Sequence, residues 1–164
     1  MKIKVGLGFD VHQLENGKDF WLGGIMIPHD KGAVGHSDAD VLIHAICDAL
    51  LGAANLRDIG YHFPNTSLKY KGIDSKILLK EVTQLIKDKG YFIGNIDATL
   101  CLEAPKINPF IPQMQNVLSK VMQIDEDDVS IKATTNETLG YVGREQGVNA
   151  YAVALIYKNV SNEV

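Results

Sequence analysis

Lys-Ile-Lys-Val-Gly-Leu-Gly-Phe-Asp-Val-His, residues 2–12, combines strand-like alternation with two potential metal ligands. The alternation over residues 2–10 predicts a β-strand. Asp10 and His12 are two positions apart, so their side chains leave an extended strand on the same face. Gly6 and Gly8, just before them, would let another backbone approach closely. The stretch therefore predicts a strand that presents a carboxylate beside an imidazole.

A helix is predicted after Gly-His-Ser-Asp-Ala-Asp, residues 35–40. We expect Ser37 to be its N-cap, with Asp40 three residues on in a variant of the capping box. His44 lies on this helix. Asp48, one turn later, is placed to accept an imidazole N–H and fix the tautomer of His44. The apolar residues at helical spacing are Val41, Ala45, Ile46, Ala49, Leu50 and Ala53.

Asp10, His12 and His44 form a candidate ligand set for a catalytic metal. A carboxylate and two imidazoles suit Zn²⁺, and three protein ligands leave a fourth position for a substrate oxygen. A simpler interpretation makes Asp10 and His12 ordinary polar residues at a strand end, and His44 a helix histidine with satisfied hydrogen bonds. The residues by themselves leave both interpretations open.

The remaining patterns predict one domain over residues 1–164. A second short apolar run lies at 20–28 around Gly23-Gly24, and strands are expected at 93–103, 129–133 and 149–157. One helix is expected from Asp74 or Ser75 up to Gly90 as its C′ glycine, another at 114–121, and a loop at 55–73. We see no repeat and no linker. Strands that alternate with helices in one such chain predict a two-layer α/β or α+β domain.

Composition excludes several classes of partner. The 164 residues include 16 Lys and Arg against 20 Asp and Glu, a formal charge of −4, so no polybasic surface is available for nucleic acid or anionic lipid. No apolar run approaches the ~20 residues that cross a bilayer, and no signal peptide is recognisable. We expect a cytoplasmic protein, in which Cys47 and Cys101 are buried thiols and form no disulfide.

Three further clusters suit phosphate or nucleotide binding. The helix start at 35–38 offers N–H groups and His36 to an anion, although capping by Ser37 alone would explain it. Residues 132–137 end a strand with hydroxyls and a carboxylate, which suit a metal–diphosphate or form an ordinary Thr-rich turn. The stiff loop 104–109 can read a base edge through its carbonyls or serve only as a connection.

Several motifs occur in a family-specific order: Gly-Phe-Asp-Val-His (8–12), Gly-His-Ser-Asp-Ala-Asp (35–40), Leu-Leu-Gly-Ala-Ala (50–54), Asp-Ile-Gly (58–60), Phe-Pro (63–64), Ala-Pro-Lys (104–106), Pro-Gln-Met (112–114) and Lys-Ala-Thr-Thr (132–135). Over about residues 3–157 the chain closely resembles the 2-C-methyl-D-erythritol 2,4-cyclodiphosphate synthases of the non-mevalonate isoprenoid route. The resemblance implies a mixed β-sheet backed by helices, and a homotrimer with active sites between neighbouring subunits.

The resemblance also implies a metal-dependent phosphorus–oxygen lyase. Its substrate is 4-diphosphocytidyl-2-C-methyl-D-erythritol 2-phosphate, and its products are the cyclic diphosphate and CMP. Asp10, His12 and His44 match the Zn²⁺ ligands of the family. Glu137 matches the contact to a second divalent cation, Mg²⁺ or Mn²⁺.

His36 and Thr135 are the candidates for stabilising the transition state, and Asp38 and Asp48 are expected to support the metal ligands. The substrate contacts that the resemblance implies are Asp10, Val11, His12, His36, Ser37, Asp58, Ile59, Gly60, Phe63, Pro64, Asn65, Thr66, Ser67, Ala104, Pro105, Lys106, Ile107, Asn108, Pro109, Phe110, Ala133, Thr134, Thr135, Asn136, Glu137, Tyr141 and Arg144.

The chain departs from the family pattern at a few positions. Asn65 and Ser67 stand where the family commonly has acids. Residues 140–147 resemble a segment that lines a cavity on the trimer axis, where Tyr141 replaces a more usual Phe and Gln146 a Glu. Arg144 in that segment is a candidate for binding an isoprenoid diphosphate.

In the implied reaction an internal phosphate attacks the β-phosphorus and CMP leaves, so catalysis consists of positioning and charge neutralisation. Two other functions remain open. A zinc phosphohydrolase could use the same three ligands to activate water, and would give linear phosphates. A non-catalytic trimer that binds isoprenoid diphosphates would use zinc only structurally.

Overall fold

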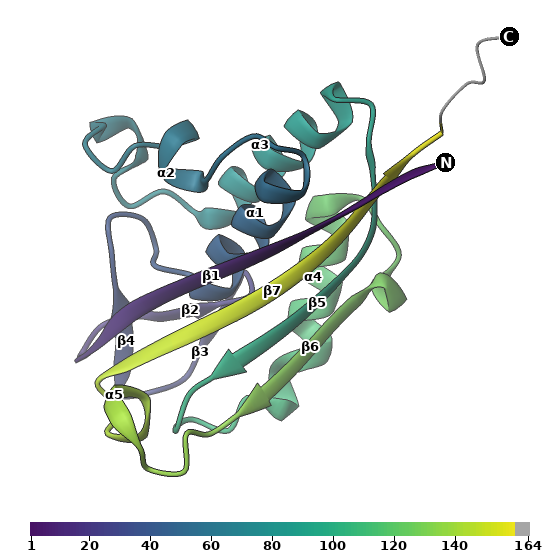
Figure 1. Cartoon of the computed structure of the whole chain (residues 1–164). Helices are drawn as coiled ribbons and strands as arrows, with labels where there is room; N and C mark the ends of the chain where they lie inside the picture. Colours follow the sequence, from purple (N-terminus) through teal and green to yellow (C-terminus); the bar gives the residue numbers. More distant parts are fainter. Residues whose placement is uncertain (160–164) are drawn as a thin grey trace, which may run out of the picture.

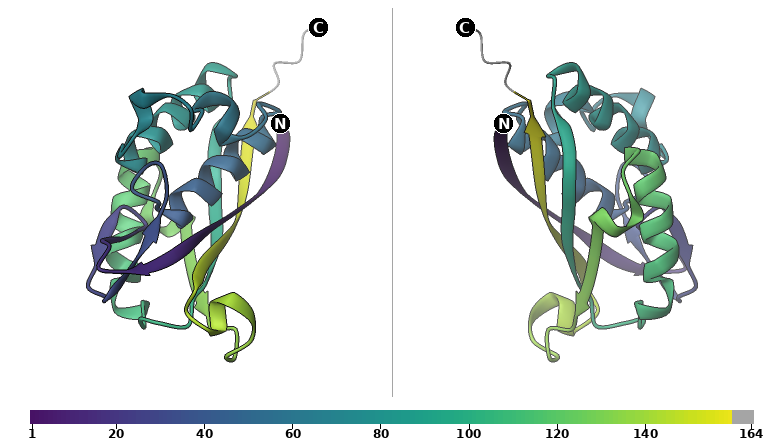
Figure 2. Two further views of the ribbon diagram at one scale, coloured as in Figure 1. Left: turned by 90° about the vertical axis from the view of Figure 1, so that its left-hand side faces the viewer. Right: turned by 90° about the vertical axis from the view of Figure 1, so that its right-hand side faces the viewer.

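The computed structural model, which describes residues 1–159, has two layers: a five-stranded sheet and a set of helices that covers one of its faces (Figures 1 and 2). The strand order is β4-β1-β7-β5-β6, and only the β5–β6 pair is parallel. The predicted two-layer fold and the mixed sheet are therefore confirmed. The strands are β1 (Lys2–Asn16), β4 (Lys31–Val34), β5 (Phe92–Cys101), β6 (Val129–Thr134) and β7 (Gly147–Lys158).

β1 extends well beyond the predicted end at residue 10 and pairs with both β7 and β4. Helix α1 (Val41–Ala53) lies across it, and two glycines allow this contact. A Cβ atom on Gly6 would lie 2.0 Å from the Ala49 carbonyl oxygen, and one on Gly8 would lie 1.9 Å from that of Ala45. The close approach expected at these glycines is thus the packing of the α1 backbone onto β1.

The predicted N-cap of α1 is wrong: the helix starts after Asp40, not after Ser37. Asp40 is fully buried, and its Oδ1 accepts hydrogen bonds from Ile43 N (3.0 Å) and Gly23 N (2.9 Å). Its Oδ2 accepts from Gly24 N at 2.7 Å. One carboxylate therefore caps α1 and also holds the turn between β2 (Phe20–Leu22) and β3 (Ile25–Ile27), a long-range contact that local spacing does not reveal.

The segment predicted as a loop at 55–73 contains two short helical turns, α2 (Ile59–His62) and η1 (Leu68–Tyr70). The helices predicted before Gly90 and over 114–121 are present. α3 (Ser75–Asp88) begins after the N-cap Asp74 and is followed by Gly90 at φ +75°. The other elements are η2 (Asn108–Phe110), α4 (Ile111–Met122), η3 (Glu126–Asp128) and α5 (Gly140–Gly143).

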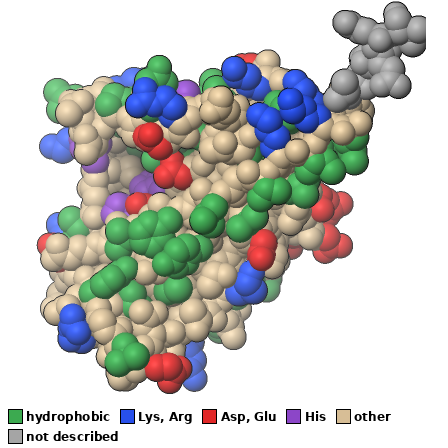
Figure 3. All heavy atoms as spheres, viewed as in Figure 1, with side chains coloured by type: hydrophobic (Ala, Val, Ile, Leu, Met, Phe, Trp, Pro, Cys, Tyr) green, Lys and Arg blue, Asp and Glu red, His purple; other side chains and the backbone are tan. Residues whose placement is uncertain are grey.

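The face of the sheet that lies away from the helices is open and apolar along β1 and β7 (Figure 3). Leu7 is 69% exposed and Val5 63%. The other exposed apolar side chains on these two strands are Ile3, Phe9, Val11, Tyr151 and Val153. Monomers rarely expose contiguous apolar patches of this kind, and such patches mark interfaces.

Both cysteines are free thiols. Cys47 is fully buried on α1, as predicted, whereas Cys101 on β5 is only partly buried. Within residues 1–159, we find no helix with the length and apolar character needed to span a bilayer.

Candidate metal centre and substrate cavities

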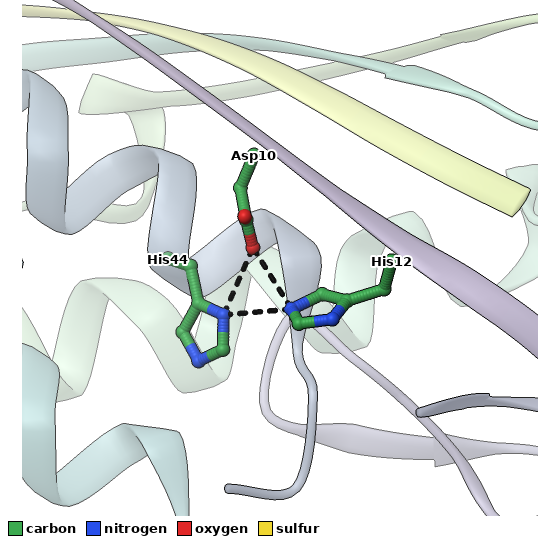
Figure 4. A group of neighbouring side chains, drawn as sticks. All are labelled: Asp10, His12 and His44. Atoms are coloured by element: carbon green, nitrogen blue, oxygen red, sulfur yellow. Dashed lines mark hydrogen bonds and ion pairs between the residues drawn. The ribbon is translucent and has the colours of Figure 1, made fainter. Parts of the chain in front are cut away.

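Asp10, His12 and His44 converge on one point between β1 and α1 (Figure 4). Asp10 Oδ2 lies 3.0 Å from His12 Nε2 and 2.9 Å from His44 Nδ1, and these two ring nitrogens are 3.1 Å apart. β1 presents Asp10 and His12 on the face that contacts α1, and the first turn of α1 supplies His44. The predicted grouping of the three side chains is thus present in the fold.

The outer nitrogen of each imidazole is held by a neighbour. His12 Nδ1 donates to the Val34 carbonyl oxygen at 3.0 Å, because a carbonyl can only accept, so Nε2 presents its lone pair to the centre when the ring is neutral. His44 Nε2 lies 2.9 Å from Ser75 Oγ and 3.1 Å from Ser37 Oγ. Hydrogen bonds of this kind fix which nitrogen of a histidine is available as a ligand.

The prediction that Asp48 accepts a hydrogen bond from His44 is wrong. The Asp48 carboxylate accepts a hydrogen bond from Ile59 N at 2.7 Å and therefore tethers the start of α2 to α1. Burial, together with the nearby Asp58 and Asp10 charges, raises the pKa of Asp48 in spite of this hydrogen bond. The residue shapes the edge of the site and does not orient the imidazole.

The centre favours a charged carboxylate beside a protonated or metal-bound imidazole. Burial acts to raise the pKa of Asp10, but hydrogen bonds and charge interactions with His12 and His44 outweigh it and hold the pKa well below its usual range. Burial likewise acts to lower the pKa of His12, yet Asp10 and the Val34 carbonyl oxygen raise it. Both shifts share one cause, the close pairing of the Asp10 carboxylate with the imidazole of His12.

These donors fit a divalent metal. One carboxylate oxygen and two ring nitrogens are directed at one another, and a divalent cation between them would replace the protons that they share without it. Their separations are slightly shorter than the about 3.3 Å that separates ligands around tetrahedral zinc with bonds of about 2.0–2.1 Å. The donor set therefore makes Asp10, His12 and His44 a candidate divalent-metal site.

The triad opens into a cavity of about 410 Å³ that contains much of the predicted substrate site. In Figure 3 the histidines are visible in a hollow beside the apolar sheet face. The predicted residues that line the cavity are Asp10, His12, His36, Ser37, His44, Ile59, Gly60, Phe63, Pro64, Asn65 and Thr66. Tyr70, Ile73 and Leu78 also line it, and no sequence pattern marked them as site residues.

Three other predicted contacts do not line this cavity. Val11 is exposed on the open face of the sheet. Asp58 caps α2, where its Oδ1 accepts from Tyr61 N at 2.9 Å. The Ser67 carbonyl oxygen accepts a hydrogen bond from His36 Nε2 at 3.1 Å, so Ser67 positions the imidazole of His36.

A second cavity, of about 390 Å³, lies at the ends of β5 and β6 and shares no lining residue with the first. Its predicted lining residues are Pro105, Lys106, Ile107, Asn108, Pro109, Ala133, Thr134 and Thr135, and Leu102 and Glu103 line it as well. Thr135 Oγ1 donates to Glu137 Oε1 at 2.9 Å. Within this one chain, His36 and Thr135 therefore belong to different cavities.

Glu103 is a functional candidate that the sequence patterns missed. Its Oε2 accepts from Asn136 N at 3.2 Å and ties the loop after β6 to the loop after β5. Ala104, Phe110, Asn136 and Glu137 flank the second cavity without lining it.

Tyr141 and Arg144 lie apart from both cavities. Tyr141 Oη accepts from Asn149 Nδ2 at 2.7 Å, and Arg144 Nε donates to Gln146 Oε1 at 3.2 Å. Arg144 borders a separate depression that also includes Lys31 and Glu145.

Comparison with known proteins gives consistent relatives over nearly the whole chain. The sequence model of the YgbB family matches residues 3–157. A 2-C-methyl-D-erythritol 2,4-cyclodiphosphate synthase from Bacteroides fragilis is 68% identical over 156 residues, which cover 95% of this chain and 98% of the relative.

Two solved structures share the fold. The CDP-bound form of a 2C-methyl-D-erythritol-2,4-cyclodiphosphate synthase superimposes with a TM-score of 0.87 at 35% identity, over 94% of this chain and 100% of that one. The bifunctional IspDF from Campylobacter jejuni gives a TM-score of 0.93 at 36% identity. That match covers 96% of this chain but 43% of the bifunctional protein, so it corresponds to less than half of its length.

Proposed function

The chain belongs to the YgbB family, and from this premise we propose that it is a 2-C-methyl-D-erythritol 2,4-cyclodiphosphate synthase. It would convert 4-diphosphocytidyl-2-C-methyl-D-erythritol 2-phosphate to the 2,4-cyclodiphosphate and CMP. The observation that carries the proposal is the open triangle of Asp10, His12 and His44, which faces a cavity bordered by His36 and Ser37.

The first cavity would hold the phosphates that react. Asp10, His12 and His44 would hold Zn²⁺, which would supply positive charge and a coordination position for a phosphate oxygen. His36 Nε2 already donates to the Ser67 carbonyl oxygen, so His36 would offer a phosphate its Nδ1 face, as a donor in the imidazolium form. The Ser37 hydroxyl lines the same cavity as a further hydrogen-bond donor.

The second cavity would hold the cytidine end of the substrate. Residues 104–110 offer backbone carbonyl and amide groups, and 133–135 offer hydroxyls at the end of β6. Binding of CDP by a homologue with a TM-score of 0.87 supports a nucleotide ligand. Glu137, which is exposed next to Thr135, would contact the second cation, Mg²⁺ or Mn²⁺.

A homotrimer would bring the two kinds of cavity together, the first from one subunit and the second from its neighbour. The open apolar face of β1 and β7 supports this assembly, because it needs a partner surface. The two cavities of one chain share no residue, which leaves His36 and Thr135 apart unless chains associate. Arg144 would face the interior of such an assembly as a candidate ligand of an isoprenoid diphosphate.

The reaction needs no protein nucleophile. An oxygen of the 2-phosphate forms a bond to the β-phosphorus as the bond from that phosphorus to the CMP oxygen breaks. His36 and Thr135 would stabilise charge on the transferring phosphoryl group, and the cavity walls would hold the attacking and leaving oxygens in line. In a protein with a formal charge of −4, the cations would neutralise the diphosphate.

The test is incubation of the zinc-loaded protein with the cytidylated substrate and Mg²⁺, followed by ³¹P NMR. We expect a cyclic diphosphate and CMP. Linear phosphates would instead indicate a zinc phosphohydrolase, and the absence of any product from zinc-loaded protein would refute the proposal. Glu137→Gln should raise the Mg²⁺ concentration that is needed for activity, whereas Glu126→Gln on η3 should not.

A further inference from the structure

Ser75, the first residue of α3, lies directly behind the metal centre. Its side chain is fully buried, at 0% exposure, and its Oγ is 2.9 Å from His44 Nε2. The other nitrogen of that ring, Nδ1, is the one that faces Asp10. Ser75 therefore contacts the imidazole on the side opposite the metal ligands, and its position at a helix start gave no hint of this contact.

The direction of each hydrogen bond follows from what Asp38 can do. The Asp38 carboxylate accepts from Ser75 N at 2.8 Å, from Asp40 N at 3.2 Å and from the Ser75 hydroxyl. An ionised carboxylate only accepts, so the hydroxyl hydrogen of Ser75 points to Asp38. Ser75 Oγ then has only lone pairs to offer His44, and His44 Nε2 must be the donor.

We propose that Asp38 and Ser75 act as a relay that fixes His44 in its Nε2–H tautomer and so presents the Nδ1 lone pair to the metal. A neutral imidazole has a single N–H, so a proton held on Nε2 leaves Nδ1 free as a ligand. This makes Ser75 a positioning residue of the metal centre. The inference rests on the proposed function, because it assumes that His44 binds zinc.

The relay also explains the role of Ser37. Ser37 Oγ accepts a hydrogen bond from Ala39 N at 3.2 Å and lies 3.1 Å from His44 Nε2. With the proton on Nε2, this single N–H is shared between Ser75 Oγ and Ser37 Oγ. Ser37 Oγ then accepts from both of its neighbours, so its own hydroxyl hydrogen has no acceptor among these groups. It is then available to a phosphate oxygen in the cavity that Ser37 lines.

A structural role alone would leave zinc affinity unchanged. Ser75→Ala keeps the backbone hydrogen bond from residue 75 to Asp38, and so keeps the start of α3, but it removes the hydroxyl. The matched control is Ser119→Ala in α4, since Ser119 is also buried, at 4% exposure, and its hydroxyl donates only to the Asn116 carbonyl oxygen. Both variants lose one buried hydroxyl, but only one loses the contact with His44.

The first measurement is zinc affinity by chelator competition, with thermal unfolding of the metal-free proteins alongside. We expect Ser75→Ala to bind zinc about 10- to 100-fold more weakly than the unsubstituted protein. Ser119→Ala should keep its affinity even if it loses a similar amount of thermal stability. In ¹H–¹⁵N spectra of metal-free, ¹⁵N-histidine-labelled protein, the ring of His44 should lose its slowly exchanging Nε2–H in Ser75→Ala and keep it in Ser119→Ala.

A second variant tests the direction of the relay. In Asp38→Asn the amide can donate to Ser75 Oγ, which turns the Ser75 hydroxyl toward His44 Nε2 and favours the Nδ1–H tautomer. Zinc affinity should fall at least as far as in Ser75→Ala. This variant keeps an acceptor for Ser75 N, so it also decides the question if Ser75→Ala fails to fold.

The outcomes distinguish a failure of the proposed relay from a failure of the proposed function. Equal zinc affinity in the unsubstituted protein and in folded Ser75→Ala or Asp38→Asn would overturn the relay and leave the proposed function standing. Equal losses in Ser75→Ala and Ser119→Ala would also overturn it, as a purely structural effect. If the unsubstituted protein binds no zinc, the relay and the proposed metal site are both wrong.

Discussion

Gly8 on β1 lies directly against Ala45 on α1, so closely that a Cβ atom on Gly8 would come within 1.9 Å of the Ala45 carbonyl oxygen. His44 is the residue before Ala45. The missing side chain at position 8 therefore sets how near α1 lies to the strand, and so how near His44 comes to Asp10, two residues further along β1.

We predict that Gly8→Ala will weaken both folding and metal binding. The obstructing atoms belong to helix backbone, which cannot move aside as a flexible side chain could, so the free energy of unfolding should fall by about 1–3 kcal/mol or more. Urea unfolding and zinc titration measure the two effects. The control is Gly52→Ala near the end of α1, where the new Cβ meets nothing within 4 Å. It should stabilise the helix by about 0.5–1 kcal/mol, and unchanged zinc binding in Gly8→Ala would contradict the role given to Gly8.

Asp10→Asn should abolish zinc binding, whereas Asp48→Asn should leave it almost unchanged. Asp10→Asn removes the charge that lies 2.9–3.0 Å from both ring nitrogens, so zinc affinity should collapse while the fold persists. Asp48→Asn should leave zinc affinity within a factor of two or so. It weakens the hydrogen bond to Ile59 N, at a cost of about 1 kcal/mol. Calorimetric zinc titration of both variants measures these affinities. A large loss of zinc affinity in Asp48→Asn would indicate that Asp48 supports His44 after all.

Leu7→Glu should convert the proposed trimer to a monomer. Leu7 is 69% exposed in the apolar patch on the open sheet face, and a charge there could not be buried against a neighbouring subunit without a large desolvation cost. Light scattering coupled to size-exclusion chromatography measures the mass. Ile77→Glu is the control, because Ile77 on α3 is 48% exposed on the helical side of the molecule. A trimer that survives Leu7→Glu would place the interface elsewhere.

The Cys47 thiol should make stability fall at alkaline pH. Burial, helped by the Asp48 and Asp40 charges, raises the pKa of Cys47 well above its ordinary value of 9.0. Above pH 9 the unfolded chain loses this proton while the folded protein keeps it, so the free energy of unfolding declines, by at most about 1.4 kcal/mol per pH unit. Below pH 9 both states hold the proton and the contribution is flat.

Comparison of urea unfolding in the unsubstituted protein and in Cys47→Ala at pH 8, 9 and 10 isolates this contribution. The variant should show a shallower decline above pH 9, whatever its stability at pH 8. Alkylation provides a second test of the same burial. Cys47 should react with iodoacetamide only in unfolded protein. Rapid labelling of Cys47 in the folded state would contradict its burial.

Local periodicity predicted which side chains share a face. The two-residue repeat of a strand places Asp10 and His12 together whatever β1 packs against, and the helical repeat over 41–53 identifies α1 together with His44. Gly90 follows the end of α3 at positive φ, a conformation that glycine adopts without steric cost, so its place in the sequence is a local signal for the helix end. These features depend on backbone geometry that neighbouring residues determine among themselves.

Partners between elements were decided by the tertiary structure. Asp40 caps α1 in place of Ser37 because its buried carboxylate also meets the Gly23–Gly24 turn. Asp48 accepts a hydrogen bond from Ile59, and Ser75, which the sequence placed only at a helix start, contacts His44. A hydrogen bond between distant segments depends on how whole elements pack, and that information is absent from the spacing of residues along the chain. The sequence alone thus determined the strand face that Asp10 and His12 share, the helix that carries His44 and the candidate ligands, whereas packing decided which neighbours orient them.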